Sequence, residues 1–550
     1  MKQRILKVHP ADNVMVALTD LQSNDEITYR DTNYKTAEPI PAKHKFAINA
    51  IPMGSEVIMY GVLVGRALSD IPSGGLLTTG NVKHDANGFL AEIHQYNWRK
   101  PDASRFEGKT FNGYHRADGS VGTANYWVIV PMVFCENRNV QVLQEALIKP
   151  LGYGRKQTYE LTAQNLIEKI KSGSSIEEVL YTELEGSSAG ANNAKVFPNV
   201  DGIKFLSHTL GCGGVRQDSV ALCGLLAGYI THPNVAGATV LSLGCQNAQV
   251  SILQDEIYKR SPDFNKPLYV LDQQKTGTEA ELLDQAIRQT LAGLMLANQN
   301  TRKPAPLSKL TIGLECGGSD GFSGISANPA IGYTSDLLVS LGGTVILSEF
   351  PELCGVEQNL IDRCVDKERA TRFSDLMRTY NQRAEDVGSG FYMNPSPGNI
   401  KDGLITDAIK SAGAAKKGGT SPVVDVLDYP EKVTKPGLNL LCTPGNDVES
   451  TTAEVGSGAN IVLFTTGLGT PTGNPIAPVV KIASNTILYN RMSDIIDINT
   501  GTVIEGDETI EQAGERILDY VVQVASGDIE VSAVRHGQDD FIPWKRGVSL

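Results

Sequence analysis

The segment Leu310–Asp320 (LTIGLECGGSD) joins a short apolar run to a Cys and then to a polar, Gly-rich turn. The same order of residue types occurs in four other segments: WVIVPMVFCEN (127–137), FLSHTLGCGG (205–214), TVLSLGCQN (239–247) and LNLLCTPGND (438–447). Short apolar runs that end in turn residues are typical of buried parallel strands. Ligands of open α/β sheets bind beyond the carboxyl ends of the strands. Where these strands lie side by side, we expect the thiols that follow them to line one crevice.

Helices are predicted between these strands. From Tyr126 onward, apolar runs alternate with longer stretches of helical period, among them 218–230, 278–297, 358–380 and 508–525. This alternation predicts mostly parallel sheets that are covered by helices on both faces. The turn-rich stretch 302–308 divides the pattern. We therefore predict two Rossmann-like α/β domains, 113–305 and 306–550.

The N-terminal part of the chain has a different pattern. Residues 1–84 contain short alternating runs separated by Pro and Gly, which predicts a small all-β module. Residues 85–112 are polar, aromatic and Pro-containing without a clear period, and we interpret them as a linker.

Composition restricts the class of protein. The chain has 550 residues, of which 41% are hydrophobic and 20% charged, values typical of globular proteins. The net charge of −13 argues against nucleic acid or an anionic membrane as the main partner, although it allows an anionic substrate. Apolar runs are too short for a membrane span, and the first residues lack the apolar core of a signal peptide. We therefore expect a cytoplasmic protein.

Eight cysteines in a chain of this length do not form a disulfide scaffold, so the thiols are buried, metal-binding or catalytic. There is no CxxC spacing, and a metal site would have to be assembled from distant segments. That argues against a zinc finger or a ferredoxin-like cluster. Thiolates together with His or carboxylate would suit a borderline metal such as iron. The alternative is that each Cys is a small residue that tolerates burial.

Gly-rich turns at 211–214, 317–321 and 444–447 bring backbone N–H groups close to a ligand and suit anions. The chain has neither a GxGxxG in a dinucleotide context nor a P-loop, so NAD and ATP are not supported. His208 lies close in sequence to Cys212, His44 lies between two lysines, and His84 is followed by Asp85. His is a common metal ligand and general base, although a single His is more often structural.

Several motifs are more specific than these turns. They are GLECGGSDGFSGISANP (313–329), NPSPGN (394–399), TPGND (443–447), PVVKIASN (478–485), YHRADGSVG (114–122) and SHTLGCG (207–213). In colinear order over nearly the whole chain, they resemble the altronate/galactarate dehydratase family. PELCGVEQ (351–358) and the ending WKRGVSL are more similar to the altronate members. The tail from Ile498 (INTGTVIEGDE) is more similar to the galactarate members.

The resemblance implies an N-terminal SAF-type (β-clip) module followed by two α/β domains. It also implies a hydro-lyase that uses a divalent metal, Fe²⁺, and a small sugar acid, with D-altronate favoured. Enzymes of this kind are commonly homo-oligomers, so we expect one here. The chain has LLTTGN (76–81) where the altronate members carry a His-rich segment, which the galactarate members also lack. It departs from the family at Leu468 and Ala124, where basic residues are usual.

Such an enzyme takes the C2 proton from the sugar acid and expels the C3 hydroxyl, giving a 2-keto-3-deoxy acid. The doubly charged aci-carboxylate that forms needs cations and N–H donors around it. We predict Lys481, His208 and His44 as catalytic residues and Cys212, Cys316 and His208 as metal ligands. The predicted substrate-binding residues are Gly317, Gly318, Ser319, Asp320, Asn446 and Asp447. The alternatives are a galactarate dehydratase, a lyase of another 2-hydroxy acid, or a paralogue that binds a sugar acid without turnover.

Overall fold

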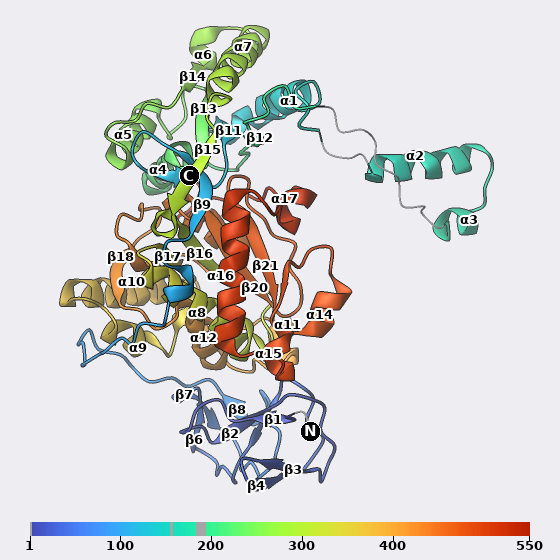
Figure 1. The fold of residues 1–550 in the computed structure, drawn as a ribbon, viewed down its shortest axis with the longest axis vertical. Helices are drawn as coiled ribbons and strands as arrows, with labels where there is room; N and C mark the ends of the chain where they lie inside the picture. The colour runs from blue at the N-terminus through green and yellow to red at the C-terminus, as the bar shows by residue number, and fades with distance from the viewer. Residues whose placement is uncertain (1–2, 155–157, 183–193) are drawn as a thin grey trace.

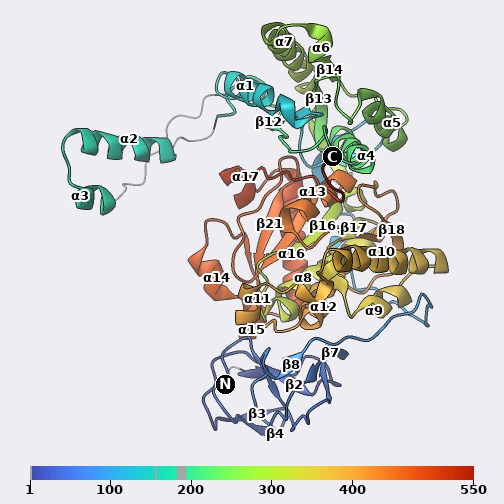
Figure 2. The ribbon, with the colours of Figure 1, turned by 180° about the vertical axis from the view of Figure 1, so that it is seen from behind.

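The structure is a computed structural model that describes residues 3–154, 158–182 and 194–550. Three units follow one another along its long axis (Figures 1 and 2). The β module lies at one end, the C-terminal unit in the middle and the second unit at the other end. The predicted fold class, an all-β module followed by α/β units with parallel sheets, is confirmed.

The N-terminal module consists of short antiparallel strands in three small sheets, β1-β2-β5, β3-β4 and β6-β7-β8. Alternating apolar residues such as Val14, Val16 and Val57 form its core, and Phe322 and Ile409 of the C-terminal unit complete it. The module therefore packs on the C-terminal unit through shared apolar surface. Its strands are Ile5–Leu6, Val14–Ala17, Glu26–Tyr29, Thr32–Lys35, Lys45–Ala47, Glu56–Met59, Val62–Ala67 and Val82–Lys83.

The second unit has a four-stranded parallel sheet in the order β12-β11-β13-β14. The fully buried β11 (Tyr126–Pro131) lies between β12 (Gly202–Phe205) and β13 (Val235–Ser242), and β14 (Leu268–Asp272) is the edge strand. Helices α1, α4, α5 and α7 pack around the sheet, whereas α2 and α3 project away from it (Figure 1). The helices are Asn137–Leu147, Thr158–Lys171, Ile176–Leu180, Arg216–Thr231, Val250–Arg260, Gln273–Thr276 and Glu279–Ala297.

A small antiparallel sheet, β10-β9-β15, connects the second unit to the C-terminal unit. Its strands are Thr110–His115 (β9), Val121–Gly122 (β10) and Arg302–Pro306 (β15). The end of the predicted linker thus enters β9, and the predicted boundary at 302–308 contains β15. One apolar core runs through both α/β units, because residues of α4 and α13 belong to it together.

The C-terminal unit contains a seven-stranded parallel sheet in the order β18-β19-β17-β16-β20-β21-β22. Helices α8 and α16 pack together against this sheet, and α13 contacts β16 and β20 (Figures 1 and 2). The strands are Thr311–Cys316 (β16), Thr344–Leu347 (β17), Val423–Leu427 (β18), Gly437–Leu441 (β19), Ile461–Thr466 (β20), Val479–Ala483 (β21) and Ile498–Asn499 (β22). The helices are Ala327–Ser340 (α8), Glu357–Asp362 (α9), Lys367–Asp386 (α10), Pro397–Lys401 (α11), Asp407–Ala414 (α12), Asp447–Ser457 (α13), Thr486–Arg491 (α14), Gly501–Glu505 (α15), Ile510–Ser526 (α16) and Ser532–His536 (α17).

The five Cys-containing turns are thus divided between two sheets. Cys135, Cys212 and Cys245 follow strands of the second unit, whereas in the C-terminal unit Cys316 ends β16 and Cys442 directly follows β19. Among the described residues, no helix combines the length and the apolar character that a membrane span requires.

Candidate active site

The turn after β16 begins with Cys316, whose thiol lies in a buried polar cluster. Its Sγ donates to Glu352 Oε2 at 3.1 Å and accepts from Lys417 Nζ at 2.9 Å. Lys417 also forms an ion pair with Glu349, which accepts from the Cys316 backbone N–H at 3.2 Å. Burial raises the pKa of Cys316 well above its usual value, with the carboxylates of Glu349 and Glu352 acting in the same direction. The sulfur is therefore a neutral thiol here.

Glu349 has a left-handed backbone, with φ of 61°. A non-glycine residue in this region costs about 1–3 kcal/mol and persists only where its surroundings impose it. One Glu349 carboxylate oxygen carries the bonds to Lys417 and to the Cys316 N–H, and the carboxylate also interacts with Glu315, a buried carboxyl group whose pKa is raised well above normal by burial and by the charge of Glu349. Strained backbone beside such a buried carboxyl pair is typical of functional sites.

Glu352 connects this cluster to helix α12. Its Oε1 lies 2.7 Å from Lys410 Nζ, which also donates to Asn394 Oδ1 at 2.6 Å. Burial opposes the charge on Glu352, but Lys410 and Lys417 hold its pKa below the usual value. Burial likewise opposes the charge on Lys410, and the nearby Glu352 raises its pKa above normal. The Glu352–Lys410 pair is therefore charged, and it places a fixed cation at the edge of the cluster.

Asp447, the first residue of α13, faces the glycine turn after β16. A Cβ atom added to Gly317 would lie 2.0 Å from Asp447 Oδ2, so a side chain at this position would displace the Asp447 carboxyl group. Burial raises the pKa of Asp447 to about 7, and the negative charges of Glu349 and Glu352 contribute. A half-buried carboxyl group that titrates near neutral pH is suited to take up and release a proton.

Asp320 joins the glycine turn to the β module. Its Oδ2 lies 3.1 Å from Lys43 Nζ, and Lys43 also pairs with Asp402 at 2.8 Å. Its carboxylate accepts further bonds from the hydroxyl groups of Ser323 and Ser484. Asp320 therefore acts as a buried anchor for the module rather than as a free substrate ligand.

The module loop around Lys43 lies directly on backbone of the C-terminal unit. A Cβ atom on Gly321 or on Gly403 would lie 2.3 or 2.4 Å from the Lys43 carbonyl oxygen. His44 follows, with Nδ1 3.2 Å from the Ala42 carbonyl oxygen, an arrangement that keeps Nε2 as the acceptor. Burial lowers the pKa of His44. A neutral imidazole of the module is thus held at the edge of the site.

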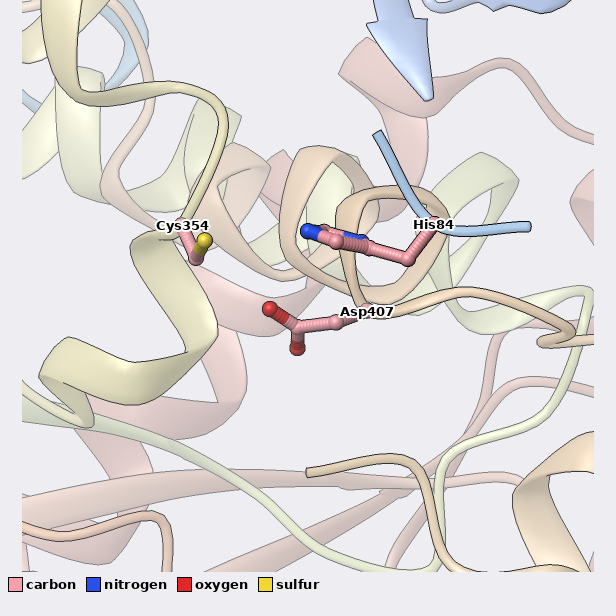
Figure 3. A group of neighbouring side chains, drawn as sticks. All are labelled: His84, Cys354 and Asp407. Atoms are coloured by element: carbon pink, nitrogen blue, oxygen red, sulfur yellow. The ribbon is translucent and has the colours of Figure 1, made fainter. Parts of the chain in front are cut away.

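A second group of metal-ligand type lies where the module meets the C-terminal unit. His84 follows β8, Cys354 ends the short helix Phe350–Leu353, and Asp407 begins α12. One ligand atom of each residue lies within 4.8 Å of the others, and the three side chains converge (Figure 3). Asp407 Oδ2 is buried without a partner in the described part of the chain, and burial lowers the pKa of His84, which favours the neutral, ligating imidazole.

Two groups of described residues could in principle hold a metal ion, and they differ in what already occupies them. In the Cys316–Glu349–Glu352 group, the ammonium groups of Lys417 and Lys410 already neutralise the carboxylates. Among the described residues, no ion pair involves the His84–Cys354–Asp407 group: Lys410 acts on Asp407 by its charge without pairing with it, and Asp407 Oδ2 makes no hydrogen bond. Imidazole, thiolate and carboxylate suit a borderline divalent ion such as Fe²⁺. This group fits the metal implied by the sequence.

The predicted metal ligands are not brought together. Cys212 and His208 belong to the second unit, and the ligand-type side chains next to Cys316 are Glu349 and Glu352. His208 Nε2 lies 2.6 Å from the Pro131 carbonyl oxygen, and its Nδ1 accepts from the Leu210 N–H at 3.1 Å. Burial lowers the pKa of His208 to about 4. Both ring nitrogens therefore bind backbone and are not available to a metal or as a base.

The remaining predicted residues have diverse positions. Lys481 is buried on β21 and donates to Gln538 Oε1 at 3.0 Å, and burial lowers its pKa to about 8. Asn446 caps α13 by accepting from the Glu449 N–H. The Ser319 carbonyl accepts from Asn399, and Gly318 adopts a positive φ of 58° beside Thr466 and Thr470. The turn Gly317–Asp320, Asp447 and the module's His44 thus come from three segments around one region, whereas Lys481 is committed to the C-terminal segment.

Sequence reasoning assigned no role to Glu349, Glu352, Lys410, Lys417, Cys354 or Asp407. A signal was present in PELCGVEQ, which carries two of these residues and resembles the family without forming a recognised ligand pattern. His84 was noted as a candidate ligand beside Asp85 but was given no partner.

A parallel-sheet fold with perturbed carboxyl, thiol and ammonium groups at the strand ends has the features of an enzyme that moves protons. Three family models match in order. They are "Altronate/galactarate dehydratase SAF domain" at residues 3–85, "D-galactarate dehydratase/Altronate hydrolase, second domain" at 113–298 and "D-galactarate/Altronate dehydratase, C-terminal" at 307–549.

Curated relatives cover almost the whole chain. The altronate dehydratases of Escherichia coli (strain K12) and Bacillus subtilis (strain 168) are each 33% identical, over 99% of this chain and 99% of their own. The galactarate dehydratase (L-threo-forming) of Escherichia coli (strain K12) is 32% identical over 95% of this chain and 92% of its own. The chain belongs to the altronate/galactarate dehydratase family. Dehydratases are hydro-lyases, so the predicted family and enzyme class are confirmed.

Proposed function

We propose that this enzyme dehydrates D-altronate to the corresponding 2-keto-3-deoxy acid. The observation that carries the proposal is the 33% identity to two altronate dehydratases over 99% of both chains. The galactarate dehydratase is nearly as similar, so galactarate is the second candidate substrate. Fe²⁺, a homo-oligomeric assembly and a cytoplasmic location belong to the same proposal.

The reaction requires one proton to leave C2 and one to reach the departing oxygen. A base breaks the C2–H bond, the electron pair forms the C2–C3 double bond, and the C3 hydroxyl leaves as water after gaining a proton. The resulting enol tautomerises to the 2-keto acid. The C2 proton is weakly acidic because its loss places a second negative charge on the carboxylate, so fixed cations must lie nearby.

We assign proton abstraction at C2 to Asp447, whose pKa of about 7 allows it to accept a proton at neutral pH. Lys410, fixed by Glu352 and Asn394, supplies positive charge for the substrate carboxylate. The Gly317–Gly318–Ser319 turn allows substrate to approach the backbone closely, since no Cβ stands at its first two positions. Asp447 touches this turn, which supports a common substrate site.

His44 is proposed to orient the substrate, because its neutral imidazole presents Nε2 as an acceptor for a substrate hydroxyl. Asp447, which has taken the proton from C2, then gives that proton to the departing C3 oxygen. We assign the metal to His84, Cys354 and Asp407. When bound, a divalent ion polarises an oxygen of the substrate and so favours both proton loss and departure of the hydroxyl.

A substrate panel tests this function. Purified protein with Fe²⁺ and a reductant is assayed for 2-keto acid release from D-altronate, galactarate and other aldonates and aldarates. We expect D-altronate to give a kcat/KM at least about 10-fold above that of galactarate, equivalent to about 1.4 kcal/mol of transition-state discrimination. Preference for galactarate would shift the assignment to the second candidate. Thermal stabilisation by sugar acids without product would identify a non-catalytic binding protein.

Replacement of a proposed metal ligand tests the metal assignment. We expect His84→Ala to lower bound Fe²⁺ and to reduce kcat by about two orders of magnitude, because the Lewis acid is lost. His94→Ala is the matched control, since His94 pairs with Asp362 on the exposed stretch that follows the module. Equal metal content in the two variants would place the ion elsewhere.

A further inference from the structure

Three cysteines of the second unit differ from the rest in exposure. Of the eight cysteines, Cys135, Cys212 and Cys245 are exposed, and the other five are buried or half-buried. Free Cys is among the most buried residue types, so three exposed thiols in one unit require an explanation. None of the three belongs to the active site proposed above.

These thiols follow three adjacent parallel strands. Cys135 comes four residues after the end of β11, Cys212 seven residues after β12 and Cys245 three residues after β13, and β11 is the central strand of the three. Because the carboxyl ends of parallel strands meet at one edge of a sheet, the three turns lie side by side.

Direct contacts join the turns. The Phe134 N–H, next to Cys135, donates to the Leu210 carbonyl at 3.0 Å, and the Ala248 N–H donates to the Gly211 carbonyl at 3.1 Å. The Asn247 side chain donates to the carbonyl of Cys212 itself at 2.7 Å. The turn that carries Cys212 is therefore hydrogen-bonded to the turns that carry the other two thiols.

The turn backbone is shaped for this contact. A Cβ atom on Gly211 would lie 2.1 Å from the Met132 carbonyl oxygen, and Gly211 has a positive φ of 98°. Gly244, which precedes Cys245, has a φ of 115°. Both glycines are required by their backbone conformation, and each stands directly before a cysteine. Two of the three thiols are thus positioned by turns that only glycine can form.

We propose that Cys135, Cys212 and Cys245 bind an iron–sulfur cluster through three thiolates. An all-sulfur ligand set selects soft-metal sites, and iron–sulfur clusters are held by Cys thiolates. Each thiol gives up one proton when it binds iron. With three protein thiolates, a four-iron cluster keeps one iron open to a small oxygen ligand such as water. This site goes beyond the proposed function and has its own ligands.

Spacing favours a cluster over a single ion. In the described part of the chain, two groups of ligand-type side chains have their ligand atoms within 4.8 Å of one another, and this triad is not one of them. The hydrogen bonds between the turns nevertheless keep the three thiols at one edge of the sheet. A cluster attaches each thiolate to a different iron atom and so needs a wider spacing than a single ion.

Each of the three thiols lies just before a helix. Helices α1, α4 and α5 begin at Asn137, Arg216 and Val250, within five residues after the respective cysteines. The partial positive charge at the N-terminus of a helix is favourable for the negative charge of a cluster with thiolate ligands. The absence of a CxxC spacing argues against a ferredoxin-like cluster, in which neighbouring residues of one turn supply several ligands, whereas here each ligand comes from a different strand end.

The test uses the full chain, purified without oxygen and reconstituted with sulfide and equal amounts of Fe²⁺ and Fe³⁺, so that the iron supplied has the oxidation state of the assembled cluster. We expect about four iron and four acid-labile sulfide per chain, a broad visible absorption band and, after reduction, a paramagnetic signal. Cys135→Ser, Cys212→Ser and Cys245→Ser should each lose at least about half of the bound sulfide and the visible band. Cys223→Ala, a buried cysteine of α4 in the same unit, is the control and should retain both.

The outcomes separate this site from the active site. His84→Ala should keep the sulfide and the visible band, even though it loses the iron of the proposed metal centre. The proposal is overturned if reconstituted protein binds iron without sulfide, or if the three Cys→Ser variants retain the full sulfide content. Dehydration by a cluster-free protein would leave the proposed function intact and confine the failure to this inference.

Discussion

Asp447 is the single residue whose ionisation controls the proposed chemistry. Burial raises its pKa to about 7, and a general base works only when deprotonated. The kcat/KM of the wild-type enzyme should therefore rise with pH through about 7 and level off above it. Removal of this base should cost about two to four orders of magnitude in kcat.

The corresponding variant is Asp447→Asn, which keeps the side-chain shape without the titrating group. We expect kcat to fall by about two to four orders of magnitude, and we expect the fall of kcat/KM below about pH 7 (the acidic limb of the profile) to disappear. Glu449→Gln is a matched control, because Glu449 lies in the same helical turn and burial also raises its pKa. If kcat/KM of Asp447→Asn still falls at low pH, another titrating group causes that fall.

The sequence indicates the position of some residues of the site but not of others. Asp447 and Gly317 were predictable because each belongs to a strand-end turn, and such turns meet at one edge of a sheet. Glu349, Glu352 and Lys417 were not, since acidic and basic residues are mostly exposed and nothing in their spacing signals burial. Their burial follows from mutual neutralisation with Cys316 at the centre, which is a property of the folded chain.

At the scale of elements, the contact between α4 and α13 joins the two α/β units. A Cβ atom on Gly228 of α4 would lie 2.1 Å from the Gly456 carbonyl oxygen of α13. Both positions are rigid backbone, so neither can move away independently. The two helices can approach this closely only because Gly228 has no side chain.

Gly228→Ala should therefore destabilise the chain, by about 1–3 kcal/mol, as overpacking of a core does. In a free helix the same change stabilises by about 1 kcal/mol, so the sign of the effect reports the contact. Thermal unfolding of the variant is compared with that of Gly88→Ala, where a Cβ atom meets nothing within 4 Å. An unchanged or raised Tm in Gly228→Ala would contradict the tight helix contact.

Helices and strands were predicted best where the hydrophobic pattern extended over many residues, and least well at their first and last residues. The expected helix 358–380 is two helices, α9 and α10, because Asp366 caps α10 by accepting from the Arg369 N–H at 3.0 Å. The turn-rich stretch 302–308 contains β15, which pairs with one neighbour only, so that its prolines face no second strand. From sequence alone, a proline-rich segment is interpreted as a turn. At the edge of a sheet, however, such a segment can pair as a strand.

At the scale of the whole molecule, the β module is attached through lysines that reach into the C-terminal unit. Lys45 is only 1% exposed, and its Nζ donates to the Gly403 carbonyl at 2.7 Å and to the Lys43 carbonyl at 3.0 Å. Burial lowers the pKa of Lys45 to about 7. Between that pH and about 10, the unfolded chain binds a proton that the folded chain has released.

The contribution of Lys45 to the free energy of unfolding should therefore rise with pH above about 7, by at most about 1.4 kcal/mol per pH unit. The difference in unfolding free energy between wild type and Lys45→Met should grow from pH 7.5 to 9. Lys43→Met is the control. Burial opposes the charge on Lys43, but Asp320 and Asp402 raise its pKa, so both states stay protonated and its difference should stay constant. A constant difference for Lys45→Met would show that its ammonium remains charged in the folded protein.

The order of the three units was predictable from composition shifts along the chain, but their contacts were not. Nothing in the sequence showed that Lys43 would pair with Asp320, 277 positions away, or that His84 would face Cys354 and Asp407. Long-range pairs of this kind depend on how complete units dock, and docking is decided by shared apolar surface rather than by local pattern.

The β module ends at His84 and presents Lys43 and His44 from its middle, so that one small body supplies an imidazole for the ion, a second imidazole and the lysine that pairs with Asp320. Any motion that lifts this body would withdraw both imidazoles and break that ion pair in a single step. Catalysis and the attachment of the module to the C-terminal unit would then be lost or restored together.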